Sequence, residues 1–113
     1  MVHKALLKDV FGFDSFRPGQ EEIIQAVIDG QNVLAIMPTG GGKSLCFQLP
    51  ALLGKGVTVV VSPLIALMRD QVRALQELGV KAGALTSGNT PEEIDAVWED
   101  LEQGNLKLLY KSL

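Results

Sequence analysis

One stretch of the sequence decides the fold: Met37-Pro38-Thr39-Gly40-Gly41-Gly42-Lys43-Ser44. Successive glycines adopt positive φ at little cost, so their backbone N–H groups can turn toward one centre and cradle phosphate oxygens. Lys43 and Ser44 then provide an ammonium for the β- and γ-phosphates and a hydroxyl suited to Mg²⁺. The usual spacing of glycine, four residues and Gly-Lys-Ser is complete except that Met37 stands in place of the first glycine.

The residues on either side of this loop fit a strand before it and a helix after it. Asn32 to Ile36 is a short apolar run, too short for a helix, and predicts the first strand. From Lys43 to about Leu53 the apolar residues recur at helical spacing, although Pro50 must loosen or bend that helix. The positive N-terminal end of the helix would add to the attraction for phosphate. We therefore expect a nucleotide-phosphate site here, with a plain glycine-rich turn as the alternative.

The rest of the chain alternates helical and strand patterns. Helices are expected at 18–29, at 65–78 and from Pro91 to near Gly104, and further strands at 57–61, 80–85 and 106–110. Thr90-Pro91-Glu92-Glu93 has the spacing of a capping box. The strand at 57–61 is β-branched and lacks polar alternation, which predicts a central strand covered on both faces. This order of elements predicts an α/β fold with a mainly parallel sheet between two layers of helices.

Composition narrows the class of protein further. The chain has 113 residues, 47% of them hydrophobic, which suits one globular domain with a modest core. Its net charge of −3 means that any contact with nucleic acid must be local. Cys46 is the only cysteine, so we expect a buried hydrophobe in a reducing compartment, with no internal disulfide and no multi-cysteine metal site. The start of the chain, Met1 to Asp9, lacks the continuous apolar segment that a signal peptide or a membrane span would need, and we expect a cytoplasmic or nucleoid-associated protein.

Several blocks of the sequence together resemble the RecQ family of superfamily 2 ATP-dependent DNA helicases. The blocks, in chain order, are Phe11-Gly12-Phe13, Phe16-Arg17-Pro18-Gly19-Gln20-Glu21, Met37 to Gln48, and Val59-Val60-Val61-Ser62-Pro63-Leu64-Ile65-Ala66-Leu67-Met68. The resemblance spans roughly residues 7–110 and is far more specific than a lone phosphate loop. It implies a RecA-like P-loop NTPase fold, with three αβα layers and an incomplete sheet, that uses ATP and Mg²⁺ and acts on DNA.

The resemblance also implies a nucleotide site. Gln20 would hydrogen-bond the adenine edge, and Phe13 and Arg17 would stack on the two faces of the base. Taken alone, Gln20 fits an exposed polar residue on a helix, and Phe13 fits a core aromatic. The phosphates would lie on Thr39, Gly40, Gly41, Gly42, Lys43 and Ser44, with Ser44 also holding Mg²⁺. Of these residues, Lys43 and Ser44 would take part in the chemistry.

A DNA contact is implied at the carboxyl end of the strand at 57–61. Ser62-Pro63-Leu64 resembles a motif that touches the backbone of single-stranded DNA, and a serine hydroxyl with free N–H groups would suit that role. The alternative is an N-cap serine followed by a first-turn proline, and both can hold at once. For Arg69, Asp70, Gln71 and Arg73 we expect a solvated helix face, with DNA contact as the alternative. For Thr86-Ser87-Gly88 we expect a turn first and a DNA contact second. Trp98 is expected to pack in the core, with base stacking as the alternative.

The resemblance predicts that residues 1–113 are the N-terminal part of the first RecA-like motor domain. The family's Asp-Glu-Ala-His block is absent, and Lys111-Ser112-Leu113 departs from the Pro-Glu-Arg continuation, so we expect a truncated, catalytically incomplete chain. The full-length protein would couple ATP hydrolysis to 3′-to-5′ unwinding of DNA in repair and recombination, with single strands and duplex junctions as partners. One alternative is a stand-alone ATP-binding or regulatory module without motor activity. A small-molecule kinase lacks sequence support for a lid or an acceptor site.

Overall fold

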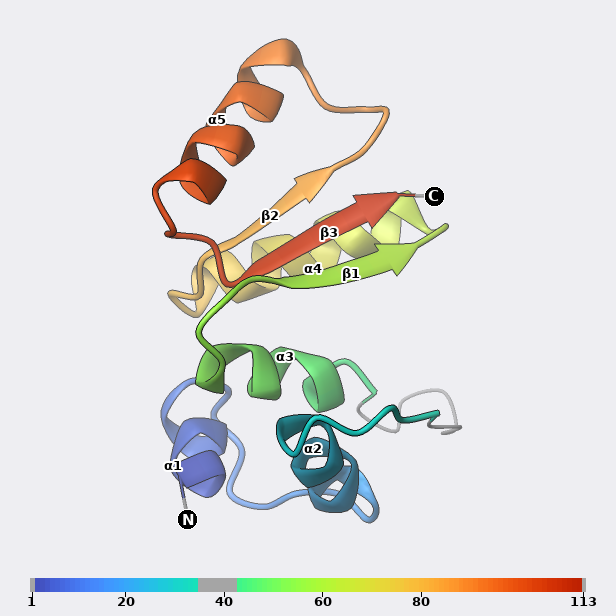
Figure 1. The fold of residues 1–113 in the computed structure, drawn as a ribbon, viewed down its shortest axis with the longest axis vertical. Helices are drawn as coiled ribbons and strands as arrows, with labels where there is room; N and C mark the ends of the chain where they lie inside the picture. The colour runs from blue at the N-terminus through green and yellow to red at the C-terminus, as the bar shows by residue number, and fades with distance from the viewer. Residues whose placement is uncertain (1, 35–42, 113) are drawn as a thin grey trace. The chain divides into compact units, whose positions relative to one another are not determined.

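The computed structural model describes residues 2–34 and 43–112 of the chain. The chain divides into two units, Met1–Lys55 and Gly56–Leu113. The first unit contains the helices α1 (Val2–Asp9), α2 (Gln20–Ile28) and α3 (Leu45–Leu53). The second contains β1 (Thr58–Ser62), α4 (Ile65–Glu77), β2 (Ala82–Leu85), α5 (Pro91–Glu102) and β3 (Leu108–Ser112), as Figure 1 shows.

The first unit is held together by one apolar cluster, to which each of its three helices contributes. Leu7 of α1, Ile24 of α2, and Leu45 and Leu49 of α3 are buried together. Leu6, Phe11, Phe16 and Leu53 pack against them and are partly buried. Because α2 and α3 both pack into this cluster, the same core holds the N-terminal ends of the two helices in place.

The boundaries of the helices in this unit follow from local sequence. The helix predicted at 18–29 is confirmed but begins at Gln20, because Pro18 and Gly19 form a turn in which Gly19 has a φ of 84°. A left-handed conformation at this position suits a residue that has no Cβ. The helix predicted from Lys43 begins at Leu45 and continues through Pro50 to Leu53.

The first predicted strand is wrong over its described part. Residues 32–34 have no strand structure, and Leu34 is 89% exposed. Ala35 and Ile36, the rest of that prediction, lie outside the described residues. An apolar run indicates a preference for burial, but a strand also requires a neighbour to which its backbone can bond. No described strand pairs with residues 32–34.

The second unit is a three-stranded parallel sheet with helices on it. The strand order is β1-β3-β2. Thr58 pairs with Leu108 on one side of β3, and Ala82 pairs with the same leucine on the other. The connection through α4 runs outward from β1 to β2 and the connection through α5 runs back to β3, so right-handed crossovers place these helices on opposite faces. The α/β class and the mainly parallel sheet are as predicted.

The prediction of a buried central strand at 57–61 is wrong for the described residues. β1 lies at one end of the sheet, and its exposure alternates along the strand, with Val59 and Val61 exposed. Within this unit α4 packs mainly on β2 and β3, and α5 packs on β2, so the valines of β1 have little cover. The β-branched run correctly predicts a strand. Whether its side chains are buried depends on which helices pack against them.

Trp98 also departs from its prediction. The apolar spacing of α5 placed it in the core, but the side chain is 53% exposed and no residue of α5 is buried. The helix approaches the sheet chiefly through Val97, whose Cγ2 would lie 3.3 Å from a Cβ built on Gly83. Helical spacing therefore identified the helix but not how deeply its apolar face would be buried.

Candidate functional site

Lys43 and Ser44 lie at the start of α3, where the sequence places the end of the phosphate loop. Ser44 is the N-cap residue, and its carbonyl accepts hydrogen bonds from Phe47 N–H at 3.2 Å and Gln48 N–H at 2.9 Å. The carbonyl of Lys43 accepts from Cys46 N–H at 3.1 Å. The lysine side chain is exposed and the serine is partly buried. Both residues therefore stand at the positive end of a helix, where a bound anion is stabilised.

The other phosphate-site residues predicted from the sequence are Thr39, Gly40, Gly41 and Gly42, and these lie outside the described residues. The fit to Mg²⁺-ATP therefore rests on Lys43 and Ser44. No side-chain hydrogen bond caps α3 through the Ser44 hydroxyl. An ammonium and a hydroxyl at a helix N-terminus are the donor set that a magnesium triphosphate requires.

The predicted adenine residues lie before and at the start of α2, in the same unit. Gln20 is the first residue of that helix and is only 3% exposed, while Phe13 and Arg17 are exposed. The backbone N–H of Arg17 donates to Oε1 of Gln20 at 2.7 Å. Gln20 is thus a buried residue with a bonded amide, so the alternative interpretation, an exposed polar side chain, is wrong. Phe13 does not lie in the core either.

Ile24 links the adenine segment to the phosphate segment. It lies one turn after Gln20 and is buried in the same cluster as Leu45, the residue that follows Ser44. The described parts of the predicted nucleotide site are therefore held by one small apolar cluster.

Cys46 lies two residues beyond Ser44 and is buried, as predicted. Burial raises the pKa of its thiol above the ordinary value, because the thiolate loses hydration. The residue therefore packs as an apolar side chain in the first turn of α3.

The predicted DNA residues lie in the second unit, where β1 ends. Ser62 is the last residue of β1, and its Oγ accepts a hydrogen bond from the N–H of Leu64 at 3.1 Å. The helix begins only at Ile65, with Leu64 as its N-cap, so Ser62 is not the N-cap and Pro63 is not in the first turn. Proline has no N–H and that of Leu64 is bonded, which removes the expected free N–H groups at 63 and 64. The Ser62 hydroxyl remains able to donate.

Thr86-Ser87-Gly88 forms the predicted turn at the end of β2, and Arg69 of α4 reaches it. Nη2 of Arg69 lies 3.5 Å from Oγ1 of Thr86, and a Cβ at Gly88 would come within 2.5 Å of the same nitrogen. Arg69 is exposed, as expected of a solvated helix face, yet its guanidinium rests on this turn. Sequence reasoning missed the residue that organises the turn, Asn89, whose side chain bonds both Thr86 and Ala84.

The described part of the chain has neither a cluster of metal-ligand side chains nor a membrane-spanning helix. No three or more His, Cys, Asp or Glu side chains gather there in a way that would hold a metal ion. None of the helices found there has the length and apolar character needed to cross a membrane.

Comparison with known proteins identifies the family. Residues 17–112 match the family model of DEAD/DEAH box helicases. The chain is 54% identical over 108 residues to the ATP-dependent DNA helicase RecQ of Haemophilus influenzae, covering 96% of this chain and 17% of that protein. It is 49% identical over 113 residues to the RecQ helicase of Bacillus subtilis, covering 97% of this chain and 19% of that protein.

A solved structure shares the fold. A crystal structure of the DUF1998 helicase MrfA bound to DNA matches with a TM-score of 0.79 and 23% identity, over 97% of this chain and 16% of that one. The chain thus spans less than a fifth of the length of each of these three helicases. Because residues 17–112 match the family model, the chain belongs to the DEAD/DEAH box helicase family. The RecQ relatives show that it is RecQ-like over nearly its whole length.

Proposed function

We propose that this chain supplies the ATP-binding part of the first motor domain of a RecQ-like DNA helicase. The observation that carries the proposal is the placement of Lys43 and Ser44 at the N-terminus of α3, within the segment that matches the helicase family. The full-length protein would couple ATP hydrolysis to 3′-to-5′ movement along DNA, acting on single strands and duplex junctions in repair and recombination.

The phosphate end of this site works by charge and helix geometry. Lys43 projects a mobile ammonium that neutralises the β- and γ-phosphates, and the Ser44 hydroxyl is the ligand that the chain offers to Mg²⁺. Thr39 and the glycines at 40, 41 and 42 are proposed to supply backbone N–H groups to the same phosphates. When bound, Mg²⁺-ATP supplies the phosphoanhydride bond whose hydrolysis drives movement.

The base end selects adenine through the orientation of one amide. Because the N–H of Arg17 donates to Oε1 of Gln20, the oxygen of that amide is fixed toward a donor. A carbonyl oxygen has a second lone pair, which can accept from the adenine N6 amino group while Nε2 donates to N7. Guanine presents an acceptor, O6, in place of the amino group and would face the same oxygen. Since Gln20 is buried, the side chains that cover it must move aside when the base binds.

The DNA end of the proposal rests on Ser62. Its Oγ already accepts from Leu64 N–H, which leaves the hydroxyl proton to donate to a phosphate oxygen. The exposed residues Pro63 and Leu64 would lie against the sugar-phosphate chain. Such contacts hold a strand without reading its sequence.

Hydrolysis requires groups that residues 1–113 do not contain. No Asp-Glu-Ala-His run occurs in the sequence, so we infer that the acidic residues that complete the magnesium site lie elsewhere in the full-length protein. Phosphate release should be measured with Mg²⁺-ATP, with and without single-stranded DNA, beside the Lys43→Ala variant as a control for contaminating ATPases. We expect no release above that control. DNA-stimulated release that Lys43→Ala abolishes would overturn the incomplete-motor part of the proposal.

A further inference from the structure

The strand β2 has an outer edge that faces away from β3. The carbonyl of Lys81, just before β2, accepts from the N–H of Lys107 at 2.8 Å, so residue 81 faces β3. Successive residues of a strand direct their N–H and C=O groups to opposite sides. The backbone N–H and C=O groups of Ala82 and Ala84 therefore point away from β3. No described strand pairs with that side. This edge would ordinarily be open to a further strand.

The side chain of Asn89 occupies this edge at Ala84. Its Nδ2 donates to the carbonyl of Ala84 at 2.7 Å, and its Oδ1 accepts from the N–H of Thr86 at 3.3 Å. In a parallel sheet, one residue of a neighbouring strand makes these same two bonds, to the C=O of one residue and to the N–H two residues later. The carboxamide of Asn89 therefore takes the place of one residue of a missing fourth strand.

The side-chain amide of Gln76 bonds the other outward carbonyl, that of Ala82. Its Nε2 donates to the carbonyl of Ala82 at 2.9 Å from the last turns of α4. The outward carbonyls of β2 are thus both bonded by side-chain amides. Asn89 is itself held in place, because Oγ1 of Thr86 donates to its Oδ1 at 2.9 Å and its own N–H donates to the Thr86 carbonyl at 3.2 Å.

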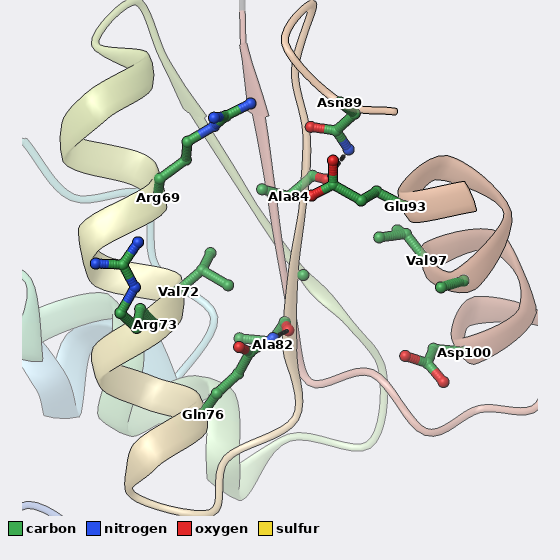
Figure 2. Close-up of a pocket in the computed structure, with 12 residues that line it drawn as sticks. Arg69, Val72, Arg73, Gln76, Ala82, Ala84, Asn89, Glu93, Val97 and Asp100 are labelled. Carbon is green, nitrogen blue, oxygen red and sulfur yellow. Dashed lines mark hydrogen bonds between the residues drawn. The ribbon is translucent and has the colours of Figure 1, made fainter. Parts of the chain in front are cut away.

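Two charged helix faces flank this edge and leave a cavity of about 390 Å³ between them. Figure 2 shows Arg69 and Arg73 of α4 on one side, and Glu93 and Asp100 of α5 on the other, with β2 between them. An incoming strand would have to enter between these walls and displace both amides. Displacement would break the hydrogen bonds of the half-buried Asn89 and the exposed Gln76, so an incoming strand would first have to replace these bonds.

We propose that Asn89 and Gln76 terminate the sheet at β2, so that this edge accepts no further strand from another molecule. The opposite edge differs. Among the described residues no side-chain amide bonds the backbone of β1, and Val59 and Val61 are exposed there. Among the described residues, the sheet therefore carries side-chain caps at β2 and none at β1, and this asymmetry does not depend on the proposed nucleotide site.

Removing the amides should open the closed edge to a second copy of the chain. The variants are Gln76→Met and Asn89→Ala, singly and together, with Gln25→Met as the matched control. Gln25 also lies on a helix and its side chain donates to Asp29 at 3.0 Å, but it is far in sequence from every described strand. Self-association is measured by sedimentation velocity over a range of concentrations. We expect the double variant to associate at a concentration about tenfold lower than the control, the effect of about one net intermolecular hydrogen bond.

A second substitution identifies the edge that is used. Ala84→Pro removes an outward N–H and no bond to β3, so it should reverse the association of the double variant. Association equal to that of Gln25→Met, or association that Ala84→Pro does not reverse, would overturn the proposal. Circular dichroism checks that each variant is folded. If the double variant unfolds, amide hydrogen exchange on Asn89→Ala alone decides the question: exchange at Thr86 N–H must accelerate, and unchanged protection there would contradict the cap.

Discussion

The backbone N–H of Arg17 and the side-chain oxygen of Gln20 are joined by a 2.7 Å hydrogen bond. This bond fixes which end of the Gln20 amide is oxygen, a choice that a free glutamine would leave open. Because Gln20 begins α2, and α2 is anchored through Ile24, the amide is held by the fold as well as by its partner. An amide fixed in this way can discriminate between bases as well as bind them.

Gln20→Glu tests that discrimination. Glutamate retains an oxygen for the Arg17 N–H but cannot donate to N7 of adenine, so the variant should lose about 1–3 kcal/mol of ATP binding. Binding of inorganic tripolyphosphate, which has no base, should be unaffected. Both affinities are measured by competition against a fluorescent ATP analogue. An equal loss for ATP and tripolyphosphate would show that Gln20 does not contact the base.

The capping box of α5 should matter more than its exposed position suggests. Oγ1 of Thr90 accepts from Glu93 N–H at 3.2 Å, and Oε1 of Glu93 accepts from Thr90 N–H at 2.8 Å. Since α5 has no buried residue, its N-terminus is a main source of local order. We expect Thr90→Ala to lower the free energy of unfolding by about 1 kcal/mol in urea titrations.

Ser87→Ala is the control for the capping box. Ser87 is an exposed hydroxyl residue in the preceding turn, and its truncation should change the free energy of unfolding by less than about 0.5 kcal/mol. Similar losses in the two variants would mean that the box contributes nothing specific.

The same box makes the stability of α5 depend on pH. The backbone N–H of Thr90, followed by its side chain, lowers the pKa of Glu93 below the ordinary glutamate value. A carboxylate whose pKa is lower in the folded state stabilises that state above its unfolded pKa, and the contribution is lost as pH falls through the folded pKa. NMR titration of the Glu93 carboxyl should show the lowered midpoint, and Thr90→Ala should raise it part of the way. A Glu93 midpoint at or above the unfolded value would refute this account.

How far the sequence predicts the structure depends on how local each feature is. The box at Thr90 and Glu93 was predicted because it lies within four residues, and the end of α4 was predicted because Gly79, with a φ of 85°, lies next to it. The exposure of Val59 and Trp98 was mispredicted, because coverage depends on what packs against a face. An apolar pattern shows that a side chain favours burial, but it does not show whether another element packs against that side chain.

The candidate site follows the same division. Ser44 stands at the start of a helix because local spacing specifies that helix. The burial of Gln20 and the bond between Ser62 and Leu64 could not be read from the motif letters, because they depend on tertiary packing and turn geometry. The role of Asn89 could not be predicted either, since its bond to Ala84 depends on the side to which the backbone of β2 directs that carbonyl.

The central claim is that this chain binds the phosphates of ATP through Lys43. The most direct test is isothermal titration of the 113-residue chain with Mg²⁺-ATP, comparing wild type, Lys43→Ala and Lys55→Ala. Lys55 is another exposed lysine of the same unit and serves as the matched control. Loss of a charge-assisted contact should raise the Kd of Lys43→Ala at least about tenfold, while Lys55→Ala binds as wild type does. Equal affinities in all three proteins would contradict the account.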